Sequence, residues 1–213
     1  MSIRDLFTTK EYSTITSESC FMISDNYKDF MFTHTRNVGK SLFLCKFTLV
    51  ESLDNNHNSL YVIKNKNYTN IINDRIFSFL DKLNITYKVV ENRKYDKITF
   101  KNGTNIKITT KLDYQDYDNI IIDDAEYFFW DKLEDDWKFK YIVNNYDKRL
   151  IMSSSFNGGL PIHPPYTKDK YYNNIIDIMD KYNIPIFNLS EEEWKIKERS
   201  FKINKIKNII KNH

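Results

Sequence analysis

The residues that most directly suggest chemistry are Gly39-Lys40-Ser41, which stand between a short apolar run and a segment with helical periodicity. Backbone N–H groups at the start of a helix bind phosphate oxygens, a lysine meets the outer phosphates, and a serine hydroxyl ligates Mg²⁺. The usual pattern is G-x-x-x-x-G-K-[ST], and His34 occupies the position of its first glycine. The segment therefore predicts a phosphate-binding loop that departs from the common form at one position.

Two acids follow the continuous apolar run 119–122. Such runs are typical of strands buried on both faces of a parallel sheet. Asp123 comes directly after this run, which places it to take up the Mg²⁺ shell through water, and Asp124 is next to it. A solvated acidic turn is the alternative, and the upstream phosphate-loop residues favour the metal site.

A run of small polar residues ends a further apolar segment that begins at Arg149. Ser153, Ser154 and Ser155 form this run, and Asn157 follows it. Ligands of open α/β sheets bind at the carboxyl ends of the strands, so these hydroxyls are placed to sense a γ-phosphate. Taken alone, a serine-rich and glycine-rich loop is the simpler interpretation.

The elements that must position these residues alternate between strand and helix. We expect strands at 29–33, 59–63, 86–90, 119–122 and 149–153, helices over 42–50 and 70–83, and a hairpin over 97–108. Asn102-Gly103 favours a type I′ turn in that hairpin, whereas residues 1–28 show no strong period. This order predicts an α/β layered fold with a mainly parallel sheet.

The bulk composition suits one α/β domain with a short appendage. The chain has 213 residues, of which 41% are hydrophobic and 15% aromatic, so it can bury a core and is not disordered. A net charge of +3 neither requires nor excludes a nucleic-acid partner. Cys20 and Cys45 are too isolated for a disulfide framework or a CxxC metal site. No apolar run approaches the roughly 18 residues of a membrane span, and no signal-peptide core is present. We therefore expect a protein that is not secreted and does not bind membranes.

Together the motifs resemble the ATPase half of phage terminase large subunits. Residues 35–41 resemble the deviant Walker A motif of that family, and the hairpin 98–108 resembles the hairpin that precedes its Walker B strand. Residues 153–158 resemble its coupling motif, with Phe156 in place of proline. This ordered set spans roughly Phe30 to Phe201.

The resemblance implies a P-loop NTPase fold of the ASCE type, flanked by helices. It also implies a division of the chain into an ATPase domain at 1–190 and a basic helical extension or linker at 191–213. The nuclease domain with its acidic metal cluster is not expected in these residues.

The resemblance also implies roles for individual residues. Lys40 would bind the outer phosphates, Arg36 would stabilise transition-state charge as a cis arginine, and Ser41 and Asp123 would hold Mg²⁺. The nucleotide would contact Thr35, Asn37, Val38, Gly39, Lys40, Ser41 and Leu42. The coupling motif would comprise Ser153, Ser154, Ser155 and Asn157.

One position of the implied site departs from the family. Asp124 stands where these ATPases carry the catalytic glutamate, and its carboxylate reaches about one methylene less far. Three interpretations remain open: Asp124 orients the attacking water, Glu126 does so from further along, or hydrolysis is weak.

The implied function is Mg²⁺-dependent ATP hydrolysis that drives double-stranded viral DNA into a procapsid. The implied location is the host cytoplasm and, transiently, the procapsid portal. The partners would be the portal and the small terminase subunit, with this chain a homo-oligomeric ring when assembled and a monomer when alone. Two alternatives remain: a helicase-like, nucleic-acid-stimulated ATPase outside packaging, and a weakly hydrolysing nucleotide-binding regulatory module.

The tail from Lys195 to His213 is basic, with Glu198 its only acid. One interpretation is contact with the DNA backbone through Lys202, Lys205, Lys207 and Lys211. The other is a solvated helix face or a linker.

Overall fold

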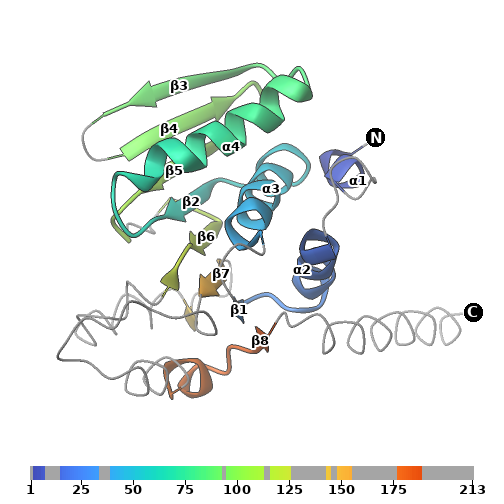
Figure 1. Cartoon of the computed structure of the whole chain (residues 1–213), viewed down its shortest axis with the longest axis vertical. Coiled ribbons are helices and arrows are strands. Elements are labelled where there is room, and N and C mark those ends of the chain that lie inside the picture. Colours follow the sequence, from blue (N-terminus) through green and yellow to red (C-terminus); the bar gives the residue numbers. More distant parts are fainter. Residues whose placement is uncertain are drawn as a thin grey trace, which may run out of the picture.

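The computed structural model describes residues 2–7, 15–33, 39–92, 95–112, 116–125, 143–144, 148–154 and 177–188, with the side chains of residues 15–20 and 188 left out. Within these residues strands and helices alternate along the chain. Figure 1 shows a single sheet with helices packed against it. In the described part, no helix is long and apolar enough to cross a membrane.

The described strands form one eight-stranded sheet in the order β3-β4-β5-β2-β6-β7-β1-β8. The strands are β1 (Phe30–Thr33), β2 (Ser59–Val62), β3 (Tyr87–Glu91), β4 (Tyr95–Phe100), β5 (Asn105–Thr109), β6 (Asn119–Ile122), β7 (Arg149–Ser154) and β8 (Ile186–Asn188). From β5 to β8 every pair is parallel, whereas β3 and β4 form an antiparallel edge. The carboxyl ends of the parallel strands therefore meet at one edge of the sheet, where α/β folds bind ligands.

The central strands are apolar because both faces of the sheet are covered. β1, β2 and β6 are buried along their whole length. Along β6, Ile121 packs in one cluster with Phe43, while Ile120 and Ile122 pack in a second cluster with Met179. Because successive side chains of a strand point to opposite faces, a single apolar run supplies both clusters.

Four helices contribute to the first cluster and cover one face of the sheet (Figure 1). They are α1 (Ile3–Phe7), α2 (Ile15–Asn26), α3 (Lys40–Leu53) and α4 (Tyr68–Lys82). α3 packs against the other three and against β2, β5 and β6, so most of its residues are buried. α4 is buried on one side only, through Ile72, Ile76 and Leu80 at helical spacing.

A lysine is enclosed where α1, α3 and α4 meet. Lys46 on α3 is 1% exposed, and its Nζ lies 5.8 Å from the ring centroids of both Phe7 and Phe79. Burial lowers the pKa of Lys46 to about 8, because the apolar surroundings disfavour the charged form. The aromatic rings offset part of this penalty through cation–π attraction.

At the amino-terminal edge of the sheet, a buried carboxylate ties α3 to the strands. Glu51 is 3% exposed and accepts a hydrogen bond from the Arg149 guanidinium at 3.1 Å. His57 Nδ1 lies 2.8 Å from the other carboxylate oxygen, and the Asn119 amide lies 3.4 Å from it. This cluster anchors the end of α3 on the side of the sheet away from Asp123.

The elements expected from the sequence are confirmed within one to three residues at most ends. The exceptions are α1, α2 and β8, which the sequence did not predict. α2 lacks a clear amphipathic period, and β8 has only three residues. The expected helix over 191–213 lies outside the described residues.

The predicted type I′ turn at Asn102-Gly103 is wrong. That turn needs positive φ at both central residues, but of the two only Gly103 has it, at +87°. The Gly103 N–H donates to the Phe100 carbonyl at 3.1 Å, and the Phe100 N–H donates to the Thr104 carbonyl at 3.0 Å. The hairpin therefore closes with a three-residue loop ending in a left-handed glycine. The Asn102 amide explains the difference, because it donates to the Ser52 carbonyl and to Asn56 and so draws the turn toward α3.

Candidate active site

The connection from β1 to α3 ends at Gly39, whose backbone is left-handed, a conformation that glycine adopts without strain. Gly39 precedes α3 with φ of +87°, and its carbonyl accepts the Phe43 N–H at 2.8 Å. The N–H groups of the first helical turn, from Lys40 onward, have no partner within the helix. These groups and the positive end of the helix dipole favour an anion at this position. Lys40 itself is 6% exposed.

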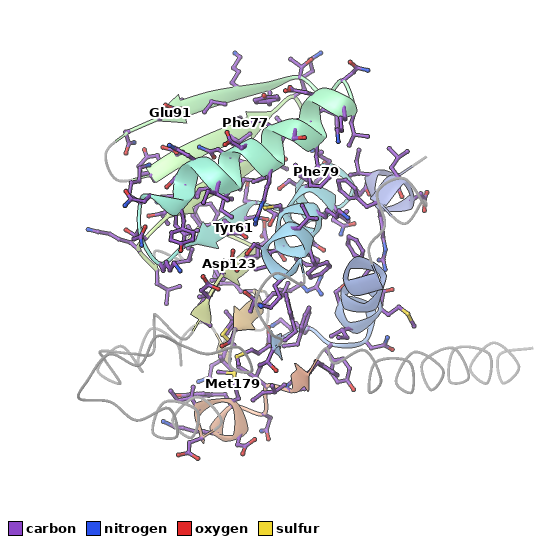
Figure 2. The ribbon with its side chains drawn as sticks, viewed as in Figure 1. Tyr61, Phe77, Phe79, Glu91, Asp123 and Met179 are labelled. Carbon is purple, nitrogen blue, oxygen red and sulfur yellow. The ribbon has the colours of Figure 1, made fainter. Side chains whose placement is uncertain are left out.

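Asp123 lies at the centre of the candidate site (Figure 2), directly after β6 and 6% exposed. Its Oδ1 accepts the Ser153 hydroxyl at 2.7 Å, and its Oδ2 accepts the Tyr61 hydroxyl at 3.0 Å. The Ser41 hydroxyl lies close enough to this carboxyl group to lower its pKa. Three elements that are distant in sequence, α3, β2 and β7, thus converge on one carboxylate.

The pKa of Asp123 is raised above its ordinary value. Burial is the largest cause, and the neighbouring Asp124 charge adds to it. The hydroxyls of Ser153, Ser41 and Tyr61 oppose the rise without cancelling it. A cation beside Asp123 would favour its ionised form.

The donor set at this point suits Mg²⁺. The Ser41 hydroxyl and the Asp123 carboxylate are oxygen ligands, which Mg²⁺ prefers. Among the described residues no group of three or more His, Cys, Asp and Glu gathers into a metal cluster. Mg²⁺ is usually held by one or two protein oxygens together with phosphates and water, so these two residues fit it.

Asp124 is held in a strained backbone by two contacts. Its φ is +55°, a left-handed value that Asp tolerates better than most residues. Its N–H donates to the Ser153 Oγ at 3.3 Å, and its Oδ2 lies 3.3 Å from Lys64 Nζ. Lys64 in turn lies 4.0 Å over the Tyr68 ring. The Asp124 side chain keeps 25% of its surface exposed, so it is accessible to solvent, unlike the buried Asp123.

Ser153 bridges the two acids. Its hydroxyl donates to the side chain of Asp123 and accepts from the backbone of Asp124. Its neighbour Ser154 is also fully buried but has no hydrogen-bond partner for its hydroxyl. Ser154 pairs in register with Thr33, the last residue of β1 before the predicted phosphate loop. β7 therefore contacts both the acids after β6 and the strand that leads to the loop.

Of the predicted site residues, the structure brings Asp123, Asp124 and Ser153 into contact and places Ser41 near Asp123. Gly39 and Lys40 lie at the start of α3, and Ser154 ends β7. Leu42 is half-buried and packs against the first apolar cluster. The remaining predicted residues lie outside the described part of the chain: Thr35, Arg36, Asn37, Val38, Glu126, Ser155, Asn157, Lys202, Lys205, Lys207 and Lys211.

Two residues of the site escaped the sequence analysis. Tyr61 lies on β2 and Lys64 just after it, and both reach the acids because β2 pairs with β6. Neither residue lies in a motif that the sequence analysis recognised, and Tyr61 fits the pattern of an ordinary buried strand residue. Burial and the Asp123 charge raise the pKa of Tyr61 well above its usual range, so it acts as a hydrogen-bond donor.

The arrangement defines a class of protein. β1 leads through a glycine to the start of α3, β6 ends in a buried acid, and β7 lies between β1 and β6. This is a P-loop NTPase fold of the ASCE type, as the sequence predicts.

Known structures share this fold. The isolated ATPase domain of a Thermus phage large terminase matches with a TM-score of 0.53 and 11% identity, over 92% of this chain and 91% of that one. A large terminase from a thermophilic bacteriophage matches with a TM-score of 0.50 and 13% identity, over 93% of this chain and 48% of that one. Dbp5 of S. cerevisiae, in a complex that contains ADP, matches with a TM-score of 0.53 and 14% identity, over 87% of this chain and 49% of that one.

The chain thus spans about half the length of the terminase and Dbp5 chains and nearly all of the isolated terminase domain. At these identities the likeness establishes the fold. No protein-family model matches the sequence, and no curated protein is similar to it.

Proposed function

We propose that the chain is the ATPase motor domain of a terminase-type DNA-packaging enzyme, which hydrolyses ATP to move double-stranded DNA into a procapsid. The junction of Ser41, Asp123 and Ser153 carries the proposal. It joins three parts of the fold: the start of α3, the acid that follows β6, and β7. The agreement of the fold with an isolated terminase ATPase domain over nearly its full length supports it.

In this proposal Lys40 and the first N–H groups of α3 bind the β- and γ-phosphates. Ser41 and Asp123 hold Mg²⁺, which neutralises charge on the transferred phosphoryl group when it is bound. Arg36 stabilises the transition state from the loop before Gly39. Tyr61 and Ser153 keep Asp123 oriented by donating to its two oxygens.

Asp124 is our first choice for orienting the attacking water, with Glu126 as the alternative. The Asp124 carboxylate is partly exposed at the edge of the site and is anchored by Lys64 and Ser153. Its shorter side chain predicts slower turnover than a glutamate in this position, because the water must approach closer to the backbone.

Ser153 is proposed to couple hydrolysis to movement. Its hydroxyl touches both acids, and Ser154 pairs with the end of β1. A change at the γ-phosphate that shifts either acid therefore reaches β7 through one residue. Ser155 and Asn157 continue this motif in the proposal.

The partners proposed are double-stranded DNA, a portal and a small terminase subunit, with the chain forming a ring at the portal in the host cytoplasm. A helicase-like ATPase is the second candidate, because Dbp5 matches with the same TM-score as the terminase domain. Stimulation by single-stranded nucleic acid in preference to duplex would favour the second candidate.

Steady-state ATP hydrolysis with Mg²⁺, with and without duplex DNA, tests the proposal. We expect turnover that duplex DNA stimulates, and a loss of about 100-fold or more in Lys40→Ala. Asp124→Asn and Glu126→Gln identify the carboxylate that orients water, because only one should lose turnover while both still bind nucleotide. Unchanged turnover in Lys40→Ala would show that the phosphate site is misassigned. Nucleotide binding without turnover in the wild type would favour a regulatory module.

A further inference from the structure

The antiparallel edge of the sheet has two chemically different faces. On the side of α4, Ile98, Phe100 and Ile106 are buried, and Phe77 stacks on Tyr87 with ring centroids 5.2 Å apart. Figure 2 shows Phe77 on α4 and Glu91 at the end of β3. The β-strand alternation assigns every other residue of β3, β4 and β5 to the opposite face.

The opposite face carries lysines and no acid. The strand register places Lys88 beside Thr99 and Lys97 beside both Val90 and Lys107. We call the three residues Lys88, Lys97 and Lys107 the lysine face.

Both acids of these strands belong to the other side. Asp96 is buried there against Lys66 and Asn73, at 2.8 and 2.9 Å, and Glu91 pairs with Asp96 in register.

The lysine face is exposed at Lys88 and partly exposed at Lys97 and Lys107. Lys88 is exposed and Val90 is 57% exposed, so no layer covers β3 on this side. Lys88 and Lys97 have no hydrogen bond or ion pair with any described residue. Lys97 and Lys107 are direct cross-strand partners, so two positively charged side chains lie next to each other on this face.

Aromatic and hydroxyl groups accompany the lysines. Lys107 Nζ lies 4.9 Å from the Tyr95 ring centroid and 5.8 Å from that of Tyr117. Thr99 lies on the same face between Lys88 and Asn105 in register. Lysines and hydroxyls are the groups that contact phosphate oxygens without reading bases.

We propose that the lysine face binds the sugar–phosphate backbone of duplex DNA, independently of sequence. The choice of duplex DNA rests on the proposed function, while the surface rests on the strand register and on Lys88 and Lys97, which have no hydrogen bond or ion pair with any described residue. A rigid sheet holds the ammonium groups in fixed rows at strand spacing, about 5 Å apart, so several can engage one backbone together. β5 pairs with β2, and Tyr61 of β2 donates to Asp123, so one strand separates this face from the proposed ATP site.

The test is the salt dependence of binding to a fluorescein-labelled random-sequence duplex, measured by anisotropy without nucleotide. Lys88→Gln/Lys97→Gln removes two charges whose side chains have no described partner, and glutamine keeps most of the aliphatic stem. The matched control, Lys82→Gln/Lys181→Gln, removes two exposed charges from α4 and from the helical residues 177–181. Lys97→Gln alone is the single-charge variant.

For the double variant we expect the slope of log binding constant against log salt to become shallower by about 2, and by about 1 for Lys97→Gln. If the binding constants of all proteins are equal at 1 M salt, the double variant should bind roughly 60- to 100-fold more weakly than the wild type at 0.1 M salt. The control should keep the wild-type slope. Thermal unfolding should be essentially unchanged in the face variants, because Lys88 and Lys97 have no hydrogen bond or ion pair with any described residue.

Two results would overturn the inference. In the first, the control loses as much slope as the face variant, which would mean that diffuse charge binds DNA. In the second, the wild type fails to bind duplex DNA at low salt. Because the assay contains no ATP, a chain that binds DNA through this face but lacks DNA-stimulated turnover would contradict the proposed function and leave this inference intact.

Discussion

Replacing Ser153 with alanine removes the residue that bridges the two acids. The substitution deletes a 2.7 Å hydrogen bond to the buried Asp123 carboxylate and the acceptor of the Asp124 N–H. A hydrogen bond to a charged group contributes about 1.5–3 kcal/mol. Asp123 keeps its hydrogen bond from Tyr61 and the nearby Ser41 hydroxyl, so we expect Ser153→Ala to lower the free energy of unfolding by about 2–3 kcal/mol. For a chain of this size that corresponds to a fall in Tm of roughly 4–12 °C.

The loss should also depend on pH. Burial already raises the pKa of Asp123 above 3.8, and the Ser153 hydroxyl opposes that rise, so alanine raises the pKa further. A carboxyl group with a higher pKa in the folded state binds more protons there, and stability falls as pH rises from the unfolded toward the folded pKa. The cost of Ser153→Ala should therefore grow as pH increases from about 4 and level off once Asp123 is ionised.

Urea unfolding in buffer with EDTA and no nucleotide measures both effects, at pH 7.5 and at the lowest pH where the wild type stays folded. Ser154→Ala is the matched control, because Ser154 is the next residue and is equally buried but its hydroxyl has no partner. It should cost less than about 1 kcal/mol at either pH. Equal losses in the two variants, or a Ser153→Ala loss that is the same at both pH values, would refute the role of the bridge.

Three further changes test other parts of the structure. Lys46→Met should raise the free energy of unfolding at pH 7. The wild type should gain up to about 3 kcal/mol of stability between pH 8 and 10.5, because the unfolded chain binds more protons there than the folded protein, and the variant should lack this gain. Urea titrations of both proteins across this pH range measure the difference. Lys64→Ala should slow ATP turnover roughly 10-fold with little change in nucleotide affinity, because Asp124 loses its ion pair. Lys64→Arg should restore most of the rate. A wild-type rate in the alanine variant would contradict a role for Lys64 in positioning Asp124. Arg149→Met should lower the free energy of unfolding by about 3 kcal/mol, because the buried Glu51 carboxylate loses its arginine partner. A Tm within about 2 °C of the wild-type value would contradict this prediction.

Local patterns determined a large part of this protein. The apolar run 119–122 followed by Asp123 predicted a buried strand ending in an acid, because a run without alternation suits a strand covered on both faces. Gly39 before a helical period predicted the start of α3, and the structure gives Gly39 a left-handed backbone, which glycine adopts without strain. The hairpin was also predicted from local sequence, because its turn residues and its alternating pattern lie within a dozen positions. The turn type was not predicted correctly.

Tertiary structure alone decided how these parts meet. The place of β7 between β1 and β6 puts Ser153 within 2.7 Å of Asp123, and the pairing of β2 with β6 brings in Tyr61 and Lys64. The lysine face likewise needs the register that sets Lys97 opposite Lys107. Strand order and register depend on hydrogen bonds between segments far apart in sequence, and on which faces the helices cover. A pattern of residue types carries that information only weakly, so the sequence named the acids and the loop but not the side chains that hold them in place.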